Sequence, residues 1–365
     1  MLSGGNMHRS SFCIHRSPFA ALLPLLLACS EPDTAPVGWK SLPTDGGASS
    51  MHGPIVVDDG AVTNGGVTAP PAVDDPDHCV SSGALHDVRA FMSDGHGAEL
   101  VARGPLYGGH GTAIVQKLDA SCNPVWTYTP PAEDTYWFFR LAVDPSGDVV
   151  VAGSLSAASE SNSTLRSSGA LLLLRLDPSG HLRWRSISAL GGRLVRIVLA
   201  PAGDVVVSGR AQDTQQGTKW DLVARYDAAG HERWRKPFGD ELARIADLTV
   251  GADGSVVVAG RFSRPFDFGG GTLTPAGDES TFDAILVKED AAGNHLFSKR
   301  FGDAASQSFD RVTVDASGNI TARGRGNGTI DFGGGPLTLG DDCTFSAGFD
   351  ASGNYAWSTL DPVED

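Results

Sequence analysis

Residues 141 to 153 read Leu141-Ala-Val-Asp-Pro-Ser-Gly-Asp-Val-Val-Val-Ala-Gly153, which is two short apolar runs joined by Asp-Pro-Ser-Gly. Pro presets φ, Gly supplies a positive φ and the Asp side chain accepts backbone N–H groups, so this tetrapeptide is typical of a tight turn. Short β-branched runs on both sides of such a turn predict a β-hairpin. The pattern recurs at 197–209, 248–260 and 312–324, with a weaker copy at 92–104.

A second motif alternates with the first and consists of an Asp followed seven residues later by an aromatic residue. Gly stands three residues after the Asp in four copies, and Cys122 takes its place in the first copy. The second motif also predicts a hairpin, so each repeat predicts a four-stranded unit. Such units at this period predict an all-β fold, a β-propeller of four-stranded blades with five recognisable repeats. The five copies are Asp119–Trp126, Asp177–Trp184, Asp227–Trp234, Asp290–Phe297 and Asp350–Trp357.

The aromatic residues of the second motif each occupy the same position of one strand. We expect them to pack between neighbouring blades as structural blade aromatics, rather than to form a platform for sugars. They are Trp126, Trp184, Trp234, Phe297 and Trp357.

Several segments resemble one bacterial family. Leu-Asp-Pro-Ser-Gly-His-Leu-Arg-Trp at 176–184, Asp-Phe-Gly-Gly-Gly at 267–271 and again at 331–335, and Lys-Arg-Phe-Gly-Asp at 299–303 are similar to the SBBP-like β-propeller repeat lipoproteins of myxobacterial type. The resemblance covers residues 88 to 357. It implies a cell-envelope propeller, mostly without an assigned activity. Members are often described with seven blades, so the blade number and the closure of the ring stay open.

The N-terminal residues predict a lipoprotein signal peptide. Arg9 and Arg16 precede an apolar run at 19–28 that is too short to span a bilayer permanently, and the run ends in Leu-Leu-Ala-Cys29. This sequence looks like a lipobox, in which the chain is cut before Cys29 and that residue carries lipid, palmitate included. Ser30 after the Cys implies sorting to the outer membrane in the lipoproteins that this motif resembles. An ordinary signal peptide cut elsewhere is the alternative.

The chain therefore divides into three predicted parts. Residues 1–28 are the signal peptide, with either Met1 or Met7 as the start. Residues 29–78 are an acidic, Pro/Gly-rich segment without a long apolar pattern, which predicts a flexible, disordered tether. Residues 79–365 are the propeller domain.

Three cysteines remain beside Cys13 of the signal peptide and the lipidated Cys29. Export to an oxidising compartment permits one disulfide among Cys79, Cys122 and Cys343. We predict Cys79–Cys122, because Cys122 replaces a turn glycine and a covalent partner would offset a strained turn. Cys79–Cys343 is the alternative.

Composition and motifs exclude several functions. The formal net charge of −15 argues against nucleic acid as a partner. The sequence carries no Cys-x-x-Cys pair, no P-loop and no Gly-x-Ser-x-Gly, and we expect neither a metal nor a cofactor. The connections between the hairpins of a blade vary in length, and binding residues are expected there. These connections are 154–169, 210–219, 261–281 and 325–342.

Arginines at one repeated position suggest an anion site. The position thirteen residues before the glycine that ends each first hairpin holds Arg140, Arg196, Asp247 and Arg311. We expect these positions to begin the innermost strand and face the axis, where arginines suit a carboxylate or phosphate of an acidic glycan or peptide terminus. The alternative is that Asp247 and Asp310 pair with the arginines and close the channel.

The sequence as a whole predicts a lipid-anchored, extracytoplasmic propeller in the outer membrane. It would act as a binding or scaffold module whose partner is an envelope protein or glycan, with no catalysis evident. An outer-membrane β-barrel assembly-type factor is one alternative, because the hairpins also look like those of PQQ-type propellers. A glycan-processing enzyme is a second alternative, which needs two facing carboxylates in the long loops. Asp267 and Asp331 recur at equivalent places, which favours structural turns instead.

Overall fold

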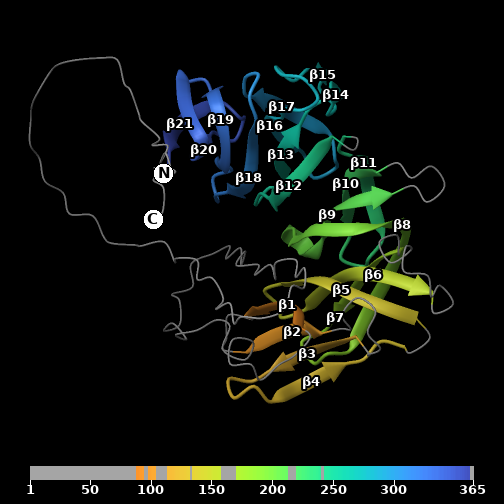
Figure 1. Cartoon of the computed structure of the whole chain (residues 1–365). Helices are drawn as coiled ribbons and strands as arrows, with labels where there is room; N and C mark the ends of the chain where they lie inside the picture. Colours follow the sequence, from red (N-terminus) through yellow and green to blue (C-terminus); the bar gives the residue numbers. More distant parts are fainter. Residues whose placement is uncertain are drawn as a thin grey trace, which may run out of the picture.

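The computed structural model describes residues 88–93, 98–103, 113–131, 134–157, 170–212, 219–239 and 242–361. In these ranges the chain is built of antiparallel strands, with one short 3-10 turn at Pro201–Gly203 and no α-helix. The strands form five four-stranded blades that follow one another around an arc in chain order (Figure 1). The predicted all-β propeller of five repeats is confirmed. Cys29, Cys79 and the predicted signal peptide and tether lie outside the described residues.

The first three blades come from the N-terminal half of the fold. Blade 1 contains β1 (Val88–Ser93), β2 (Glu99–Arg103), β3 (Ile114–Leu118) and β4 (Pro124–Tyr128). Blade 2 contains β5 (Asp134–Val143), β6 (Val149–Ala157), β7 (Ala170–Leu176) and the first part of β8 (Leu182–Leu199). The second part of β8 continues directly into blade 3, which also contains β9 (Val205–Gln212), β10 (Lys219–Tyr226) and β11 (Glu232–Pro237).

Blades 4 and 5 complete the arc. Blade 4 contains β12 (Ala243–Val250), β13 (Val256–Phe262), β16 (Asp283–Glu289) and β17 (His295–Phe301), with a small hairpin of β14 (Phe266–Asp267) and β15 (Thr272–Leu273) between its two halves. Blade 5 contains β18 (Gln307–Val314), β19 (Ile320–Asp331), β20 (Pro336–Phe349) and β21 (Tyr355–Leu360). The connection 325–342 is therefore not a loop but an extension of the β19–β20 hairpin.

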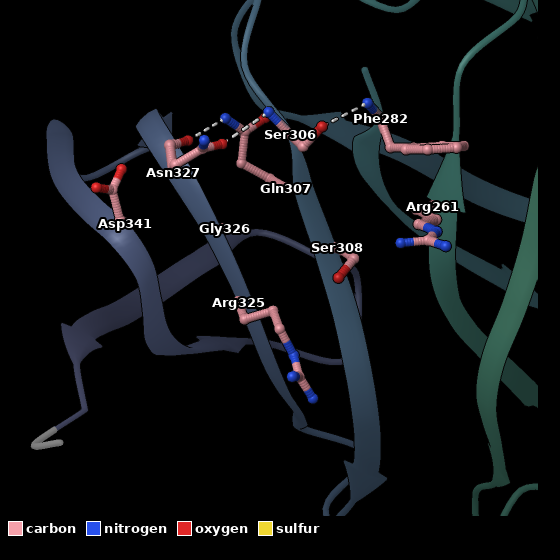
Figure 2. Close-up of a pocket in the computed structure, with 9 residues that line it drawn as sticks. All are labelled: Arg261, Phe282, Ser306, Gln307, Ser308, Arg325, Gly326, Asn327 and Asp341. Carbon is pink, nitrogen blue, oxygen red and sulfur yellow. Dashed lines mark hydrogen bonds between the residues drawn. The ribbon is translucent and has the colours of Figure 1, made fainter. Parts of the chain in front are cut away.

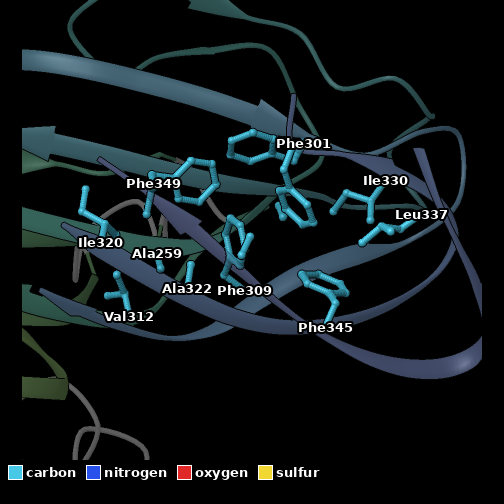
Figure 3. Close-up of a cluster of buried hydrophobic side chains, with 14 of the residues drawn as sticks. Ala259, Phe301, Phe309, Val312, Ile320, Ala322, Ile330, Leu337, Phe345 and Phe349 are labelled. Carbon is cyan, nitrogen blue, oxygen red and sulfur yellow. The ribbon is translucent and has the colours of Figure 1, made fainter. Parts of the chain in front are cut away.

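The first strand of each blade lies toward the middle of the arc and the fourth at its periphery (Figure 1). The first strands contact one another in series, β1 with β5, β5 with β8, β8 with β12 and β12 with β18. Blades 1 and 5 stand at the two ends of the arc. Apolar side chains gather in four clusters, and each cluster fills the junction between two consecutive blades. In the junction of blades 4 and 5, Phe301, Phe309, Phe345 and Phe349 pack edge to face or tilted (Figure 3).

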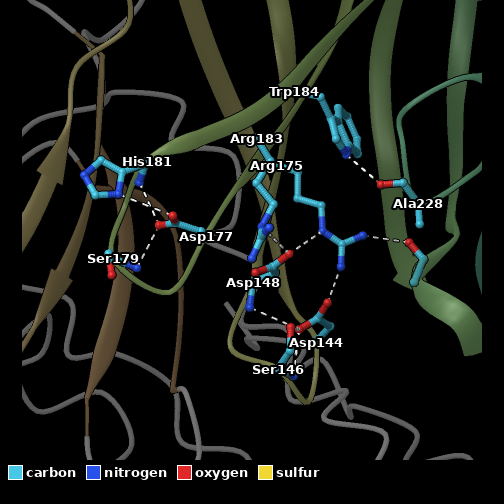
Figure 4. A network of polar contacts seen from close by, with 11 residues as sticks. Asp144, Ser146, Asp148, Arg175, Asp177, Ser179, His181, Arg183, Trp184 and Ala228 are labelled. Carbon is cyan, nitrogen blue, oxygen red and sulfur yellow. Dashed lines mark hydrogen bonds and ion pairs between the residues drawn. The ribbon is translucent and has the colours of Figure 1, made fainter.

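The Asp that opens each predicted turn of the second motif holds that turn with its side chain. Asp177 shows the arrangement, because its Oδ1 accepts the backbone N–H groups of Ser179 and His181, both at 2.9 Å (Figure 4). The bond from the His181 N–H is the main reason why the pKa of Asp177 lies below its usual value. The fourth residue of the turn has a positive φ, and at Cys122 this angle is 62° in a residue that is not glycine. Cys122 therefore occupies the strained turn that the sequence predicted.

The aromatic residue of one blade packs on the turn glycine of the next. A Cβ added to Gly230 would lie 2.7 Å from the Trp184 ring, so only glycine fits beneath the indole. The Trp184 Nε1–H also donates to the Ala228 carbonyl of the same turn at 2.8 Å (Figure 4). Blades 1 and 3 repeat this contact, through bonds from Trp126 Nε1 to Pro178 O at 3.0 Å and from Trp234 Nε1 to Ala291 O at 3.2 Å. Phe297 covers Gly353 in the same way without the hydrogen bond.

A buried cation adds a second tie between consecutive blades. Arg175 of blade 2 pairs with Asp144 and Asp148 of its own blade and donates from Nη1 to Gly203 O of blade 3 at 2.8 Å (Figure 4). Arg225 of blade 3 makes the equivalent bond to the Gly254 carbonyl of blade 4 at 2.7 Å. These guanidinium groups replace their lost water with charge-assisted hydrogen bonds, so they hold the blades in register at the turn end of the strands.

The turn glycines permit a matched test of the aromatic contact. Gly230→Ala and Gly147→Ala both place a Cβ at a positive φ, but the Cβ at Gly147 would meet only Pro178, at 3.4 Å. Both variants should lose roughly 1–2 kcal/mol from backbone strain, and Gly230→Ala should lose about 1–3 kcal/mol more from collision with Trp184. Urea unfolding of the two variants measures the difference. Equal losses would show that the indole does not fix this junction.

Candidate binding site

A β-bulge interrupts the first strand of every blade at the same place. The register shifts by one residue between Phe138 and Arg140 in β5, and equivalent shifts precede Arg196, Asp247 and Arg311. The prediction that these four positions begin the strand is wrong, since β5 begins at Asp134 and β18 at Gln307. They follow a bulge inside the strand, where a bulge re-aims side chains.

The bulge also explains the glycine that ends each first hairpin. A Cβ at Gly260 would collide with the Arg244 carbonyl and lie 3.2 Å from the Ala246 nitrogen, which belongs to the bulged residue. Gly324 meets the Ser308 carbonyl in the same way. A side chain at these positions would therefore push the two strands apart.

Arg196 is engaged by a carboxylate of the neighbouring blade. Its Nε lies 2.6 Å from Oδ1 of Asp247, and Oδ2 of Asp247 accepts the Val312 N–H of blade 5 at 3.0 Å. One buried carboxylate thus links blades 3, 4 and 5. For Arg196 this agrees with the alternative interpretation, in which Asp247 pairs with one of these arginines. Asp310 pairs instead with Arg325, at 2.7 Å. Arg140 is half-buried and Arg311 exposed, and anion binding by the three arginines stays a prediction.

A pocket of about 380 Å³ opens between blades 4 and 5, at the end of the strands where the hairpin connections vary (Figure 2). We call it the blade 4–5 pocket. Its walls come from the end of β13, the segment before β16, the start of β18 and the β19–β20 hairpin. The lining residues are Arg261, Phe282, Ser306, Gln307, Ser308, Arg325, Gly326, Asn327 and Asp341.

Arg261 presents a guanidinium group to this pocket without a carboxylate partner. The group stacks over the Phe282 ring, 4.4 Å from its centroid. The residues opposite Arg261 are Arg244 on β12 and Ala284 on β16, and Arg261 makes no ion pair with a described residue. Stacking on the ring restrains a long side chain that is otherwise exposed, which reduces the entropy lost when a ligand binds.

The same position holds Arg in blades 3 and 5, where the charge is already compensated. Arg210 lies opposite Asp221, and Arg325 pairs with Asp310. The sequence carried this signal as a Gly-Arg pair that follows the apolar run in three repeats, at 209–210, 260–261 and 324–325. This pair is not among the residues predicted above to bind a ligand, although each arginine begins one of the connections in which binding residues are expected. The identity of the opposite residue, which distinguishes Arg261, depends on strand register.

A hydrogen-bonded wall fixes the other side of the pocket. Gln307 is 1% exposed, and its Nε2 donates to Asp303 Oδ1 at 2.8 Å and to Asn327 O at 2.6 Å. Ser306 and Asn327 exchange two further bonds, from Ser306 N to Asn327 Oδ1 and from Asn327 N to Ser306 O, both at 3.0 Å (Figure 2). These bonds hold the wall together, and Ser308, whose Oγ donates to Asp310 Oδ1 at 3.4 Å, lies beside it in the pocket lining.

The arrangement suits a small anionic group. The guanidinium group of Arg261, which has no carboxylate partner among the described residues, matches the planar or tetrahedral oxygens of a carboxylate or phosphate. Asp341 is the one carboxylate among the described lining residues, whereas glycoside hydrolysis ordinarily uses two. Asp267 and Asp331 instead accept backbone N–H groups in their own turns. The described residues contain no group of three metal-ligating side chains and no helix long and apolar enough to cross a membrane.

No family model and no curated protein matches the sequence. Solved structures with a similar fold include the polysaccharide lyase Uly1, at 10% identity over 75% of this chain and 72% of that chain, with a TM-score of 0.45. The Dos1 propeller is 11% identical over 72% of this chain and 65% of that chain, with a TM-score of 0.41. A protein of unknown function from Bacteroides caccae is 12% identical over 73% of this chain and 78% of that chain, with a TM-score of 0.37. At these identities the likeness concerns the fold alone.

Asp221, opposite Arg210, predicts a measurable pH dependence. Burial raises its pKa to about 6 from 3.8, so ionisation of Asp221 opposes folding as the pH rises through this window. Asp221→Asn keeps an acceptor for the Ile245 N–H. The free energy of unfolding of the variant, relative to that of the parent protein, should rise by roughly 2–3 kcal/mol from pH 4 to pH 8, as measured by denaturant unfolding.

Asp227 supplies the matched control with the opposite sign. Hydrogen bonds, first of all from the His231 N–H, hold the pKa of Asp227 below its usual value. The stability that its charged form contributes is present above the unfolded-state pKa and is lost as the pH falls. Asp227→Asn should therefore lose stability at pH 8 relative to the parent protein. If the stability difference between Asp221→Asn and the parent protein stays constant from pH 4 to pH 8, the assignment is contradicted.

Proposed function

We propose that this protein is a lipid-anchored binding module of the bacterial outer membrane, with the blade 4–5 pocket as its binding site. The ligand carries a carboxylate or phosphate, as an acidic glycan or a peptide terminus does. The observation that carries the proposal is Arg261, whose guanidinium is stacked on Phe282, faces the pocket and has no carboxylate partner among the described residues.

The charge of the whole chain makes such a local site necessary for anion binding. A formal net charge of −15 repels anions at a distance. An anion is then held only where fixed cations and hydrogen-bond donors lie at contact distance, and this interaction is screened by salt. Arg261 supplies the free cation, and Arg325 and Ser308, which both donate to Asp310, line the pocket beside it.

The sequence supports the cellular address. The lipobox-like Leu-Leu-Ala-Cys29, the acidic segment 29–78 and the resemblance to SBBP-like repeat lipoproteins all favour a propeller held at the membrane by acyl chains. Several acyl chains on one residue anchor a protein stably, whereas one chain alone gives marginal binding. The predicted Cys79–Cys122 disulfide would fasten the segment before β1 to blade 1.

The binding proposal is tested with two arginines of the same loop region. Arg261→Ala should weaken binding of a panel of uronic-acid oligosaccharides and free-carboxylate peptides by at least about 10-fold, because one charge-assisted pair is lost. Arg264→Ala is the control, since Arg264 is exposed but already holds both oxygens of Glu279, at 2.8 and 2.9 Å. Isothermal titration measures both variants. The proposal fails if Arg261→Ala binds like the parent protein or if the parent protein binds no member of the panel.

The anchor is tested independently. Cys29→Ser removes the sulfur that would carry lipid, so the variant should move from the outer-membrane fraction to the soluble fraction after cell lysis, with its unfolding midpoint unchanged. Cys343→Ser is the control for loss of a cysteine and should stay in the outer-membrane fraction, whatever it does to the junction of blades 4 and 5 in which Cys343 is buried. Full membrane retention of Cys29→Ser would contradict the lipid anchor.

A further inference from the structure

Each blade has a forward face, which we define as the face that contacts the next blade in blades 1 to 4. In blade 4 this face carries Val257, Ala259 and Leu286, all 0% exposed. Thr321 and Arg323 precede Gly324 of blade 5 as Val257 and Ala259 precede Gly260 of blade 4. Ser346 corresponds to Leu286, because it lies opposite Arg323 as Leu286 lies opposite Ala259. Thr321 and Arg323 are exposed and Ser346 is half-buried.

The pattern along the second strand shows the same change. β13 begins Val-Val-Val-Ala and is buried on both faces, as strands between two layers are. β19 begins Ile-Thr-Ala-Arg and alternates buried and exposed, as strands with one wet face do. Terminal repeats of stacked arrays carry such a polar outer face because no further repeat covers them. The forward face of blade 5 is therefore built to meet water.

The residues that tie consecutive blades together are also changed at both ends of the arc. Gly348 stands in blade 5 where blades 2 and 3 have the buried Arg175 and Arg225. At the other end, Cys122 replaces the turn glycine of blade 1, and a Cβ at the equivalent Gly180 would lie 2.7 Å from an aromatic ring. Trp357 therefore cannot pack on blade 1 as the internal aromatics pack on their neighbours.

Trp357 remains as an aromatic platform on this polar face. Its ring lies directly over Gly348, where any Cβ would collide with the indole, and 44% of the residue is exposed. The Nε1–H of Trp357 makes no hydrogen bond with a described residue, whereas those of Trp126, Trp184 and Trp234 donate to the next blade. One face of the ring is packed on the strand, and the opposite face is open.

Hydrogen-bonding groups occupy the adjacent row of the same face. Arg323, Ser346 and Thr359 lie side by side on β19, β20 and β21. Arg323 Nε pairs with Asp361 Oδ2 at 3.0 Å, and Ser346 Oγ donates to the same oxygen at 3.1 Å. Neighbouring rows of one sheet face are about 7 Å apart, so these groups lie within reach of a sugar chain that is stacked on Trp357.

We infer that the forward face of blade 5 binds a neutral polysaccharide, with a pyranose ring stacked on Trp357. The apolar C–H face of a sugar suits the open indole face, and its hydroxyls suit the Arg323–Asp361 pair, Ser346 and Thr359. A protein partner that buries a large apolar area does not fit a face of Thr, Ser and Arg. An anion does not fit either, because the charge of Arg323 is already compensated by Asp361. This surface is distinct from the blade 4–5 pocket and does not depend on the proposed function.

The test compares Trp357 with an internal aromatic in the full chain purified in detergent. The probes are neutral oligosaccharides of glucose, mannose, galactose and N-acetylglucosamine, measured by titration calorimetry and indole fluorescence. Trp357→Ala should weaken binding at least 10-fold and lower the unfolding midpoint much less than Trp184→Ala does. Trp184→Ala should lower the midpoint by several degrees, because its ring is wedged between blades.

Two further variants separate the possible failures. Arg323→Gln should also weaken binding to the neutral probes, while Arg261→Ala should leave it unchanged. The inference is overturned if no probe binds the parent protein or if Trp357→Ala binds normally. It is also overturned if Trp357→Ala lowers the midpoint as much as Trp184→Ala, because Trp357 would then be a packing residue. None of these outcomes bears on anion binding through Arg261.

Discussion

The contact of an aromatic ring with the turn glycine of the next blade is the interaction on which this arc depends. Trp184 covers Gly230 so closely that no side chain fits, and its indole N–H satisfies a carbonyl of the same turn. The contact fixes both the distance and the tilt between two sheets. Apolar clusters then fill each junction, but hydrophobic contact is not directional and does not by itself specify one geometry.

At this junction, an aromatic residue of one blade constrains the turn sequence of the next blade. Gly230 is required by Trp184, which is 46 positions earlier in the printed sequence. The same logic explains Cys122, because a positive φ alone is tolerated at some cost, whereas a Cβ beneath an aromatic ring is not. No aromatic residue of an earlier blade is described over the Cys122 turn, so this turn of blade 1 does not require glycine.

The fold could be predicted because its turns depend on residues close together in the sequence. The pocket could not, because it depends on which residues lie opposite one another in neighbouring strands. The turn residues at Asp177 and Gly180 act within four positions of one another, so their spacing alone predicted hairpins, blades and the five-fold repeat. Arg261 lies across from Ala284 where Arg210 lies across from Asp221, and it is exposed where Arg210 is half-buried. That pairing depends on the length of the connection between hairpins and on the bulge, and neither follows from the motif.

Repetition also explains how one arginine position acquires different roles. In blade 3 the arginine lies opposite a buried carboxylate, and in blade 5 it pairs with Asp310. Each junction is held by its own aromatic and apolar contacts, so the loss of a carboxylate opposite Arg261 leaves the blade intact and a cation uncompensated. Stacking on Phe282 then keeps this cation in place at the pocket. A binding group therefore arises where the repeat is imperfect, on a scaffold that the other copies of the repeat keep rigid.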